Sequence, residues 1–151
     1  MTGTSTSEIT GRCLCGAISF TATAKVDQDG KVAVGACHCG MCRTWSGGVL
    51  LAVDEASDLR VDGEDRLAVY KSSDWGERCF CRTCGTNLFW RSPSLGVLAI
   101  MAGALDDQSG LSLTKQIFID EKPAHFSFAE PTQTYTGEEF VKLMTSGGSG
   151  S

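Results

Sequence analysis

The chain has 151 residues, of which 42% are hydrophobic and 21% are charged, as is ordinary for one soluble domain with a real core. Lys and Arg number 13 and Asp and Glu 18, so the net charge is −5, with no basic cluster. This charge argues against general binding to nucleic acids or anionic membranes, which needs concentrated positive charge. The longest apolar runs, 48–53 and 97–104, are too short to span a bilayer.

The first dozen residues are rich in Thr and Ser and have no apolar core, so we do not read them as a secretory signal. We expect residues 1–10 to be disordered, a zinc-binding domain over 11–145, and a flexible tail over 146–151. A cytoplasmic location follows as an expectation, and the cytosol keeps thiols reduced. We therefore expect the eight cysteines to bind metal rather than to form a disulfide framework.

Short strands separated by turns are predicted along most of the chain. Residues 17–23 alternate apolar and polar, the period of a half-buried strand. Eighteen glycines among short strands, without an alternation of strands and helices, indicate an all-β sandwich or tent of two sheets. One short C-terminal helix is expected after Thr136, which with Glu139 fits a capping box. Further strands are predicted at 31–36, 49–53, 59–61, 67–70, 87–90, 97–101 and 115–119, with a weaker pattern at 124–128.

All eight cysteines lie in three short clusters. Thiols this close together have few physical uses, namely metal binding, redox chemistry or nucleophilic catalysis. The clusters are Cys13 and Cys15; Cys37, Cys39 and Cys42; and Cys79, Cys81 and Cys84.

Two of the clusters together predict a closed metal site. Cys81 and Cys84 form a C-x-x-C turn that Gly85 eases, and such a turn brings both sulfurs to one metal. Cys13 and Cys15, two apart on an extended strand, also point to one side. Neither pair completes a tetrahedron, but the four thiolates together do. We therefore expect a structural zinc here, because closed tetrahedral sites stabilise folds and leave no position for a substrate.

The central cluster predicts a different kind of site. Cys37, Cys39 and Cys42 can hold a metal without remote help, and three protein ligands leave the fourth position open, as in catalytic zinc sites. Alternatively, His38, Cys79 or a remote residue could supply the fourth ligand and close the site. A histidine between two ligating cysteines on an extended strand would point away from the metal, so we do not expect His38 to be a ligand.

An open site with three thiolates favours thiol chemistry over hydrolysis. Zn²⁺ with three thiolates is formally −1, which makes it a weak Lewis acid for activating water but suits it to holding a soft thiol as the thiolate. Cys79 could join Cys81 and Cys84, could close the open site, or could be buried as a small hydrophobe, which we favour. Asp106 and Asp107 are expected to form a turn.

Four motifs in order resemble those of one family, the glutathione-dependent formaldehyde-activating (Gfa) or CENP-V domain family. The resemblance covers about residues 8–145, and its motifs stand at residues 11–17, 37–43, 80–88 and 103–107. It implies an Mss4-like two-sheet β fold and two zinc ions. The resemblance assigns the structural zinc to Cys13, Cys15, Cys81 and Cys84, and the second, labile and catalytic zinc to Cys37, Cys39 and Cys42.

The resemblance also implies an activity, the condensation of glutathione with formaldehyde to S-hydroxymethylglutathione, which is classed as a carbon–sulfur lyase reaction. Our first hypothesis is therefore an enzyme that joins a small thiol, glutathione, to formaldehyde or a related electrophile. The alternatives are a related enzyme with a different thiol-dependent substrate, and a zinc-stabilised β binding module without turnover. We expect no nucleic-acid or membrane partner, and a homodimer is left open.

Overall fold

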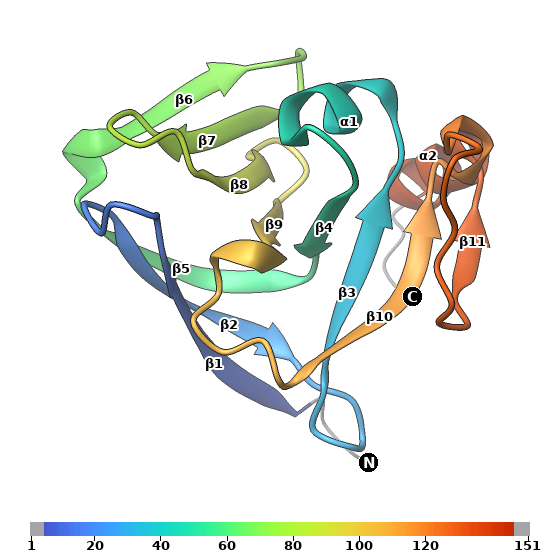
Figure 1. The fold of residues 1–151 in the computed structure, drawn as a ribbon, viewed down its shortest axis with the longest axis horizontal. Coiled ribbons are helices and arrows are strands. Elements are labelled where there is room, and N and C mark those ends of the chain that lie inside the picture. The colour runs from blue at the N-terminus through green and yellow to red at the C-terminus, as the bar shows by residue number, and fades with distance from the viewer. Residues whose placement is uncertain (1–4, 147–151) are drawn as a thin grey trace. The chain divides into compact units, whose positions relative to one another are not determined.

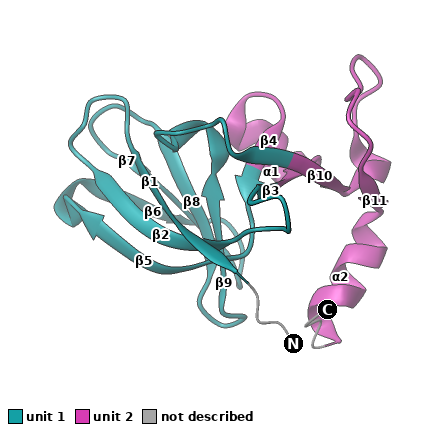
Figure 2. Ribbon diagram, turned by 90° about the horizontal axis from the view of Figure 1, so that it is seen from below, with its two compact units in different colours: residues 1–33, 52–112 teal, residues 34–51, 113–151 magenta. Residues whose placement is uncertain are grey.

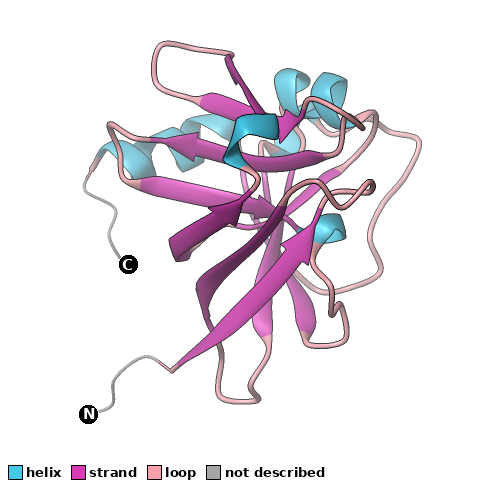
Figure 3. Cartoon of the chain, turned by 90° about the vertical axis from the view of Figure 1, so that its left-hand side faces the viewer, coloured by secondary structure: helices cyan, strands magenta, loops and turns pink. Residues whose placement is uncertain are grey.

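The computed structural model describes residues 5–146, which divide into two compact units (Figure 2). Of the described residues, unit 1 comprises 5–33 and 52–112, and unit 2 comprises 34–51 and 113–146. Strands make up most of the regular structure and the helices are short (Figures 1 and 3). In chain order the elements are β1 (Thr6–Arg12), β2 (Ser19–Lys25), β3 (Val32–Cys37), α1 (Gly40–Ser46), β4 (Leu50–Val53), β5 (Ala56–Asp62), η1 (Glu64–Arg66), β6 (Leu67–Lys71), β7 (Glu77–Cys81), β8 (Asn87–Ser92), β9 (Val97–Met101), η2 (Ala102–Ala104), β10 (Leu111–Ile117), η3 (Ile119–Glu121), β11 (Gln133–Tyr135) and α2 (Gly137–Thr145).

Unit 1 contains a three-stranded antiparallel sheet in the order β1-β2-β5, with β2 in the middle (Figure 1). The alternation predicted from the sequence of β2 is present, because Phe20, Ala22 and Ala24 are buried while the residues between them are only partly covered. The Phe20 ring meets the Phe89 ring of β8 edge-on, with 5.1 Å between the ring centroids. This contact belongs to the core of unit 1.

The other strands of unit 1 form an antiparallel meander in the order β9-β8-β7-β6, to which residues 52–53 of β4 add on the β9 side. Leu88, Phe89 and Ile100 are fully buried there. The strands predicted at 87–90 and 97–101 form a hairpin, since β8 and β9 pair antiparallel from Phe89 to Ser92, and β9 occupies the predicted residues 97–101.

Unit 2 contains both α-helices and strands in the order β11-β10-β3. β10 pairs with β11 in parallel, and the backbone N–H of His38 donates to the carbonyl of Ile117 at 3.1 Å. The predicted capping box of α2 is confirmed, because Thr136 and Glu139 each accept a hydrogen bond from the other's backbone N–H. No helix within residues 5–146 is long and apolar enough to cross a membrane.

The expected all-β class is confirmed, with two sheets and a short C-terminal helix. Strands are present at every predicted range except 124–128, which is a turn and irregular chain. Three strands and one helix were not predicted, namely β1, β7, β11 and α1. The helix starts where Cys39 caps it, since the Cys39 side chain accepts from the backbone N–H of Cys42, and it stops at Gly47, whose φ of 79° is left-handed.

The expected disorder of residues 1–10 is wrong for residues 6–10, which belong to β1. This strand pairs with β2 along its whole length, so its order comes from a partner that its Thr- and Ser-rich sequence does not reveal. Gly11 in β1 also makes a close approach, because a Cβ there would lie 2.4 Å from the carbonyl oxygen of Ala104. Residues 1–4 and 147–151 lie outside the described part, and the limits of the zinc-binding domain remain a prediction.

Candidate metal centres

Four cysteines of unit 1 lie together, and we call them the four-cysteine group: Cys13, Cys15, Cys81 and Cys84. Their sulfur atoms all lie within 4.8 Å of one another. Cys13 Sγ is 3.6 Å from Cys15 Sγ, which is 3.8 Å from Cys81 Sγ. Zinc with four Zn–S bonds of about 2.3 Å would place sulfurs about 3.8 Å apart, so these residues fit the metal.

Two tight turns supply the four-cysteine group. Cys13 follows β1 directly, and its carbonyl accepts from the N–H of Gly16, so this cluster lies in a turn rather than on the expected extended strand. Cys81 ends β7, and its carbonyl accepts from the N–H of Gly85, which takes the left-handed conformation at φ 81°. The glycine after the C-x-x-C turn is therefore required by backbone geometry.

Hydrogen bonds aimed at sulfur lower the pKa values of two thiols in this group. The hydroxyl of Thr86, 3.2 Å from the sulfur, and backbone N–H groups lower the pKa of Cys84 to about 5. The backbone N–H groups of Cys84 and Thr83 lower the pKa of Cys81. Cys15 differs, because burial and the neighbouring thiols outweigh the lowering by the Ala17 N–H and raise its pKa to about 11. A bound cation would relieve this crowding of thiols.

The second group, which we call the three-cysteine group, lies in unit 2 and consists of Cys37, Cys39 and Cys42. Cys37 ends β3, Cys39 is the N-cap of α1, and Cys42 lies in the first turn of α1. Their sulfur atoms lie within 4.8 Å of one another. Hydrogen bonds with the thiols of Cys39 and Cys42, together with burial, raise the pKa of Cys37. Burial and the neighbouring thiols therefore favour the protonated form of Cys37.

His38 is fully buried and lies outside the three-cysteine group. Its Nε2 is 2.8 Å from Oε1 of Gln116, and since that oxygen only accepts, Nε2 carries the proton and donates. Gln116 in turn donates to the hydroxyl of Thr132 at 2.9 Å. The imidazole lies beside the rings of Phe126 and Phe128, with centroids 5.8 and 6.2 Å away, and its Nδ1 is buried without a hydrogen bond.

Two charged side chains hold the backbone between the cysteines of the second group. Nε of Arg43 donates to the carbonyl of His38 at 2.9 Å. Oε1 of Glu121 accepts from the backbone N–H of Gly40 at 3.0 Å. His38 and Gly40 are the two neighbours of Cys39, so these hydrogen bonds hold the backbone on both sides of that cysteine.

Cys79 lies in neither group. It is fully buried in β7, as we favoured from the sequence, and burial raises its pKa. The register shift in the β7–β8 pairing leaves Leu88 of β8 without a partner on β7, because Cys79 pairs with Phe89 and Phe80 pairs with Asn87. The sulfur of Cys79 is not among the four that lie within 4.8 Å of one another.

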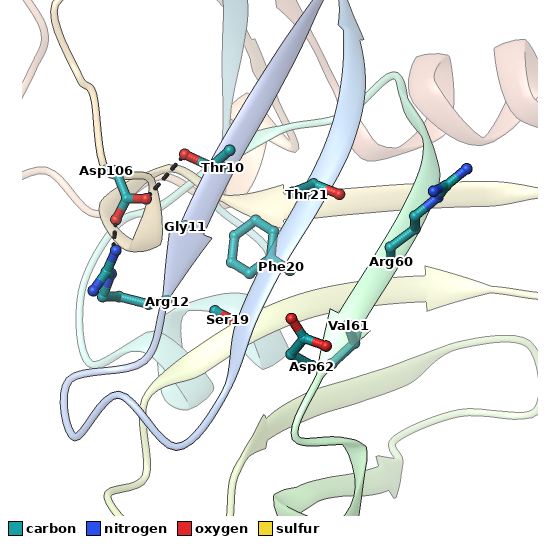
Figure 4. Close-up of a pocket in the computed structure, with 10 residues that line it drawn as sticks. All are labelled: Thr10, Gly11, Arg12, Ser19, Phe20, Thr21, Arg60, Val61, Asp62 and Asp106. Carbon is teal, nitrogen blue, oxygen red and sulfur yellow. Dashed lines mark hydrogen bonds and ion pairs between the residues drawn. The ribbon is translucent and has the colours of Figure 1, made fainter.

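A pocket of about 480 Å³ lies on the three-stranded sheet of unit 1 and contains no cysteine (Figure 4). Thr10 and Arg12 of β1 both turn toward Asp106, whose carboxylate accepts from the Thr10 hydroxyl at 2.9 Å and from Arg12 Nε at 3.1 Å. Asp106 therefore links β1 to the segment after β9, whereas we expected it only to form a turn. Asp107 is a turn former, because it accepts from the N–H and the hydroxyl of Ser109.

All seven cysteines predicted as ligands are brought together in the two predicted sets, and every cysteine of the chain is free of a disulfide. Their roles as metal ligands remain a prediction. The sequence reasoning missed Thr86, Gln116 and Glu121. Thr86 stands two residues after a C-x-x-C pair, which is a usable signal for a group near the sulfur. Gln116 and Glu121 lie 78 and 81 residues from their partners, and no local pattern identifies them.

Comparison with known proteins identifies the family of the chain. The family model of the glutathione-dependent formaldehyde-activating enzyme matches residues 8–121. An uncharacterized lyase of Schizosaccharomyces pombe is 30% identical over 138 residues, which cover 91% of this chain and 97% of the relative. A Halomonas elongata protein, provisionally named as a glutathione-dependent formaldehyde-activating enzyme, is 30% identical over 91 residues, 55% of each chain.

One solved structure shares the fold. A crystal structure of a Rhodobacter sphaeroides protein matches with a TM-score of 0.52 and 24% identity, covering 64% of this chain and 87% of that one. The family model spans most of the chain and includes all eight cysteines. The chain therefore belongs to the glutathione-dependent formaldehyde-activating enzyme family.

Proposed function

We propose that this chain is a zinc-dependent enzyme of the carbon–sulfur lyase type that joins a small thiol, glutathione, to formaldehyde. Family membership supports the reaction class, and the two cysteine groups support two zinc ions per chain. The four-cysteine group would hold a structural zinc, and the three-cysteine group would hold the catalytic one. We further propose a cytoplasmic location, where the eight thiols stay reduced.

The observation that carries this proposal is the composition of the three-cysteine group. Among residues 5–146, no fourth His, Cys, Asp or Glu side chain joins Cys37, Cys39 and Cys42. His38, the nearest candidate in the sequence, is instead engaged with Gln116. Three protein ligands leave one position of a tetrahedron for a substrate.

The chain's own residues would fix the geometry of the reaction. Cys37 and Cys39 are half-buried, so a small molecule can approach them, while Cys42 is buried in α1 and holds the group in place. A zinc ion in this group would lower the pKa of an incoming thiol and keep it as the thiolate. The thiol would give its proton to solvent as it ionises. Its sulfur would then attack the aldehyde carbon, so that a carbon–sulfur bond forms as the carbonyl π bond breaks, and the oxygen would take one proton back from solvent, with no net proton change. Holding both reactants side by side supplies the remaining acceleration.

The decisive variant is Cys39→Ser. It removes a proposed catalytic ligand at the N-cap of α1, where serine still caps the helix. We expect zinc content to fall from two to one and the enzymatic rate to fall by about 100-fold or more, since even indirect contacts of a metal site cost 10–100-fold. The rate of S-hydroxymethylglutathione formation above the uncatalysed addition, followed by NMR exchange, measures the activity.

Thr44→Ala, on an exposed position of the same helix, is the matched control and should leave both quantities unchanged. Zinc content should also fall from two toward one when excess glutathione competes for the labile metal. If Cys39→Ser abolishes folding, or keeps the wild-type rate, the open site is not the catalytic one. A constant two zinc ions without any turnover would favour a zinc-stabilised binding module instead.

A further inference from the structure

One segment of unit 2 makes three hydrogen bonds with residues 37–42, which we call the ligand loop, two of them to its backbone and one to the His38 side chain. The N–H of His38 donates to the carbonyl of Ile117 at 3.1 Å, and its Nε2 donates to Gln116 at 2.8 Å. The N–H of Gly40 donates to Oε1 of Glu121 at 3.0 Å. The loop therefore does not set its own shape, and residues 116–121 hold it on both sides of Cys39.

A strained turn aims Glu121 at the loop. Phe118 adopts the left-handed conformation with φ 55° and ψ 44°, which is costly for a non-glycine residue, and its carbonyl accepts from the N–H of Glu121 at 2.9 Å. Its ring packs against Gly137 so closely that a Cβ on that glycine would lie 2.5 Å from it. This packing keeps Phe118, and with it η3, in one conformation.

Two adjacent carboxylates of η3 bind the starts of the two helices of unit 2. Glu121 accepts from Gly40, the first residue of α1, while Asp120 accepts from the N–H of Gly137, the first residue of α2, at 2.8 Å. Only Glu121 acts on the helix that carries cysteines. The neighbouring Asp120 therefore provides a matched comparison within the same turn.

We infer that Glu121 is a positioning residue for the metal of the three-cysteine group. Its bond to Gly40 fixes the first residue of α1 and so sets the directions of Cys39, just before it, and Cys42, two residues on. Its negative charge gives no advantage beside a centre that is formally −1 when zinc is bound, so the hydrogen bond accounts for its position. This inference rests on the proposed metal centre.

The test measures metal affinity and needs no turnover. Zinc is titrated against a chromophoric chelator for the wild type, Glu121→Ala, Glu121→Gln and Asp120→Ala, and thermal unfolding is recorded for each. We expect Glu121→Ala to bind one of its two zinc ions about tenfold more weakly. Glu121→Gln keeps an acceptor oxygen and should stay within about twofold of the wild type. Asp120→Ala should lower the melting temperature and leave both affinities unchanged.

Three results with the variants would overturn the inference. Unchanged affinity in Glu121→Ala would show that the bond does not position the ligands. Equal weakening in Glu121→Gln would assign the effect to charge, and equal weakening in Asp120→Ala would assign it to general loosening of η3. A wild-type protein that binds only one zinc would overturn the proposed function as well, so the two failures are distinguishable.

Discussion

The two cysteine groups differ in how far apart along the chain their sulfur atoms originate. In the four-cysteine group, Cys15 and Cys81 are 66 residues apart and lie in two separate turns of unit 1. In the three-cysteine group, six consecutive residues supply every sulfur. A metal in the first group closes a long loop of chain, whereas a metal in the second constrains a turn and the start of one helix. Only the first can stabilise unit 1 to a large extent.

The pKa values of the thiols also differ between the two cysteine groups. Polar groups aimed at sulfur lower the pKa values of Cys81 and Cys84, so part of the first group is prepared to be ionised. In the second group the neighbouring thiols and burial raise the pKa of Cys37. Protons compete with metal for thiolates, so the shift of Cys37 favours release of metal from the second group, although the raised pKa of Cys15 acts in the same direction in the first. The comparison associates the four-cysteine group with stability of the fold and the three-cysteine group with exchange of its metal.

The largest expected effect separates the groups by stability. Cys81→Ser removes a buried, proposed ligand of the four-cysteine group and should lower the free energy of unfolding by more than about 4 kcal/mol, because loss of a structural metal is strongly destabilising. Cys42→Ser, equally conservative and also buried, should cost only about 1–2 kcal/mol. Circular dichroism during thermal unfolding, with metal content per chain, measures both. Equal losses for the two variants would remove the distinction.

An intermediate effect concerns pH. The Thr86 hydroxyl is the first cause of the lowered pKa of Cys84, so Thr86→Val should raise that pKa toward its ordinary value. Protons then compete better, and the structural metal should be released at a pH higher by about half a unit, given about 1 kcal/mol for one hydrogen bond. Metal release into a chelator during acid titration measures this midpoint.

Thr83→Val is the control for this prediction. Its hydroxyl accepts from Arg66, while the backbone N–H that points at Cys81 remains in the variant. The release midpoint should therefore stay at the wild-type value. If both variants shift it equally, the effect arises from loosening of the turn and not from the hydroxyl at sulfur.

Features fixed by local chemistry could be predicted from the sequence. The capping box at Thr136 depends on four consecutive residues, and the C-x-C and C-x-x-C spacings limit which sulfurs can share a metal. Strand β9 was predicted with its correct limits because an apolar run bounded by turn residues has few other conformations available. These local rules define the three-cysteine group and the two pairs of the four-cysteine group, whereas the two pairs were joined because neither completes a tetrahedron alone.

Features fixed by tertiary contact could not be predicted. β1 is polar and becomes a strand because β2 pairs with it and Asp106 binds Thr10 and Arg12. α1 has only seven residues, and the side chain that caps it is a cysteine, which capping preferences do not include. Glu121 reaches Gly40 across 81 residues. In each case the structure depends on a tertiary contact that the residue's own sequence does not indicate.

The smallest expected effect concerns Cys79, the cysteine outside both groups. Cys79→Ala removes a fully buried sulfur and should cost about 1 kcal/mol of unfolding free energy, since it leaves a small cavity beside Phe89. Zinc content should stay at the wild-type value, because the sulfur of Cys79 lies outside the four that lie within 4.8 Å of one another. Metal analysis and thermal unfolding distinguish the two roles. Loss of a zinc ion would make Cys79 a ligand, and the first group would then no longer be the closed set of four thiolates.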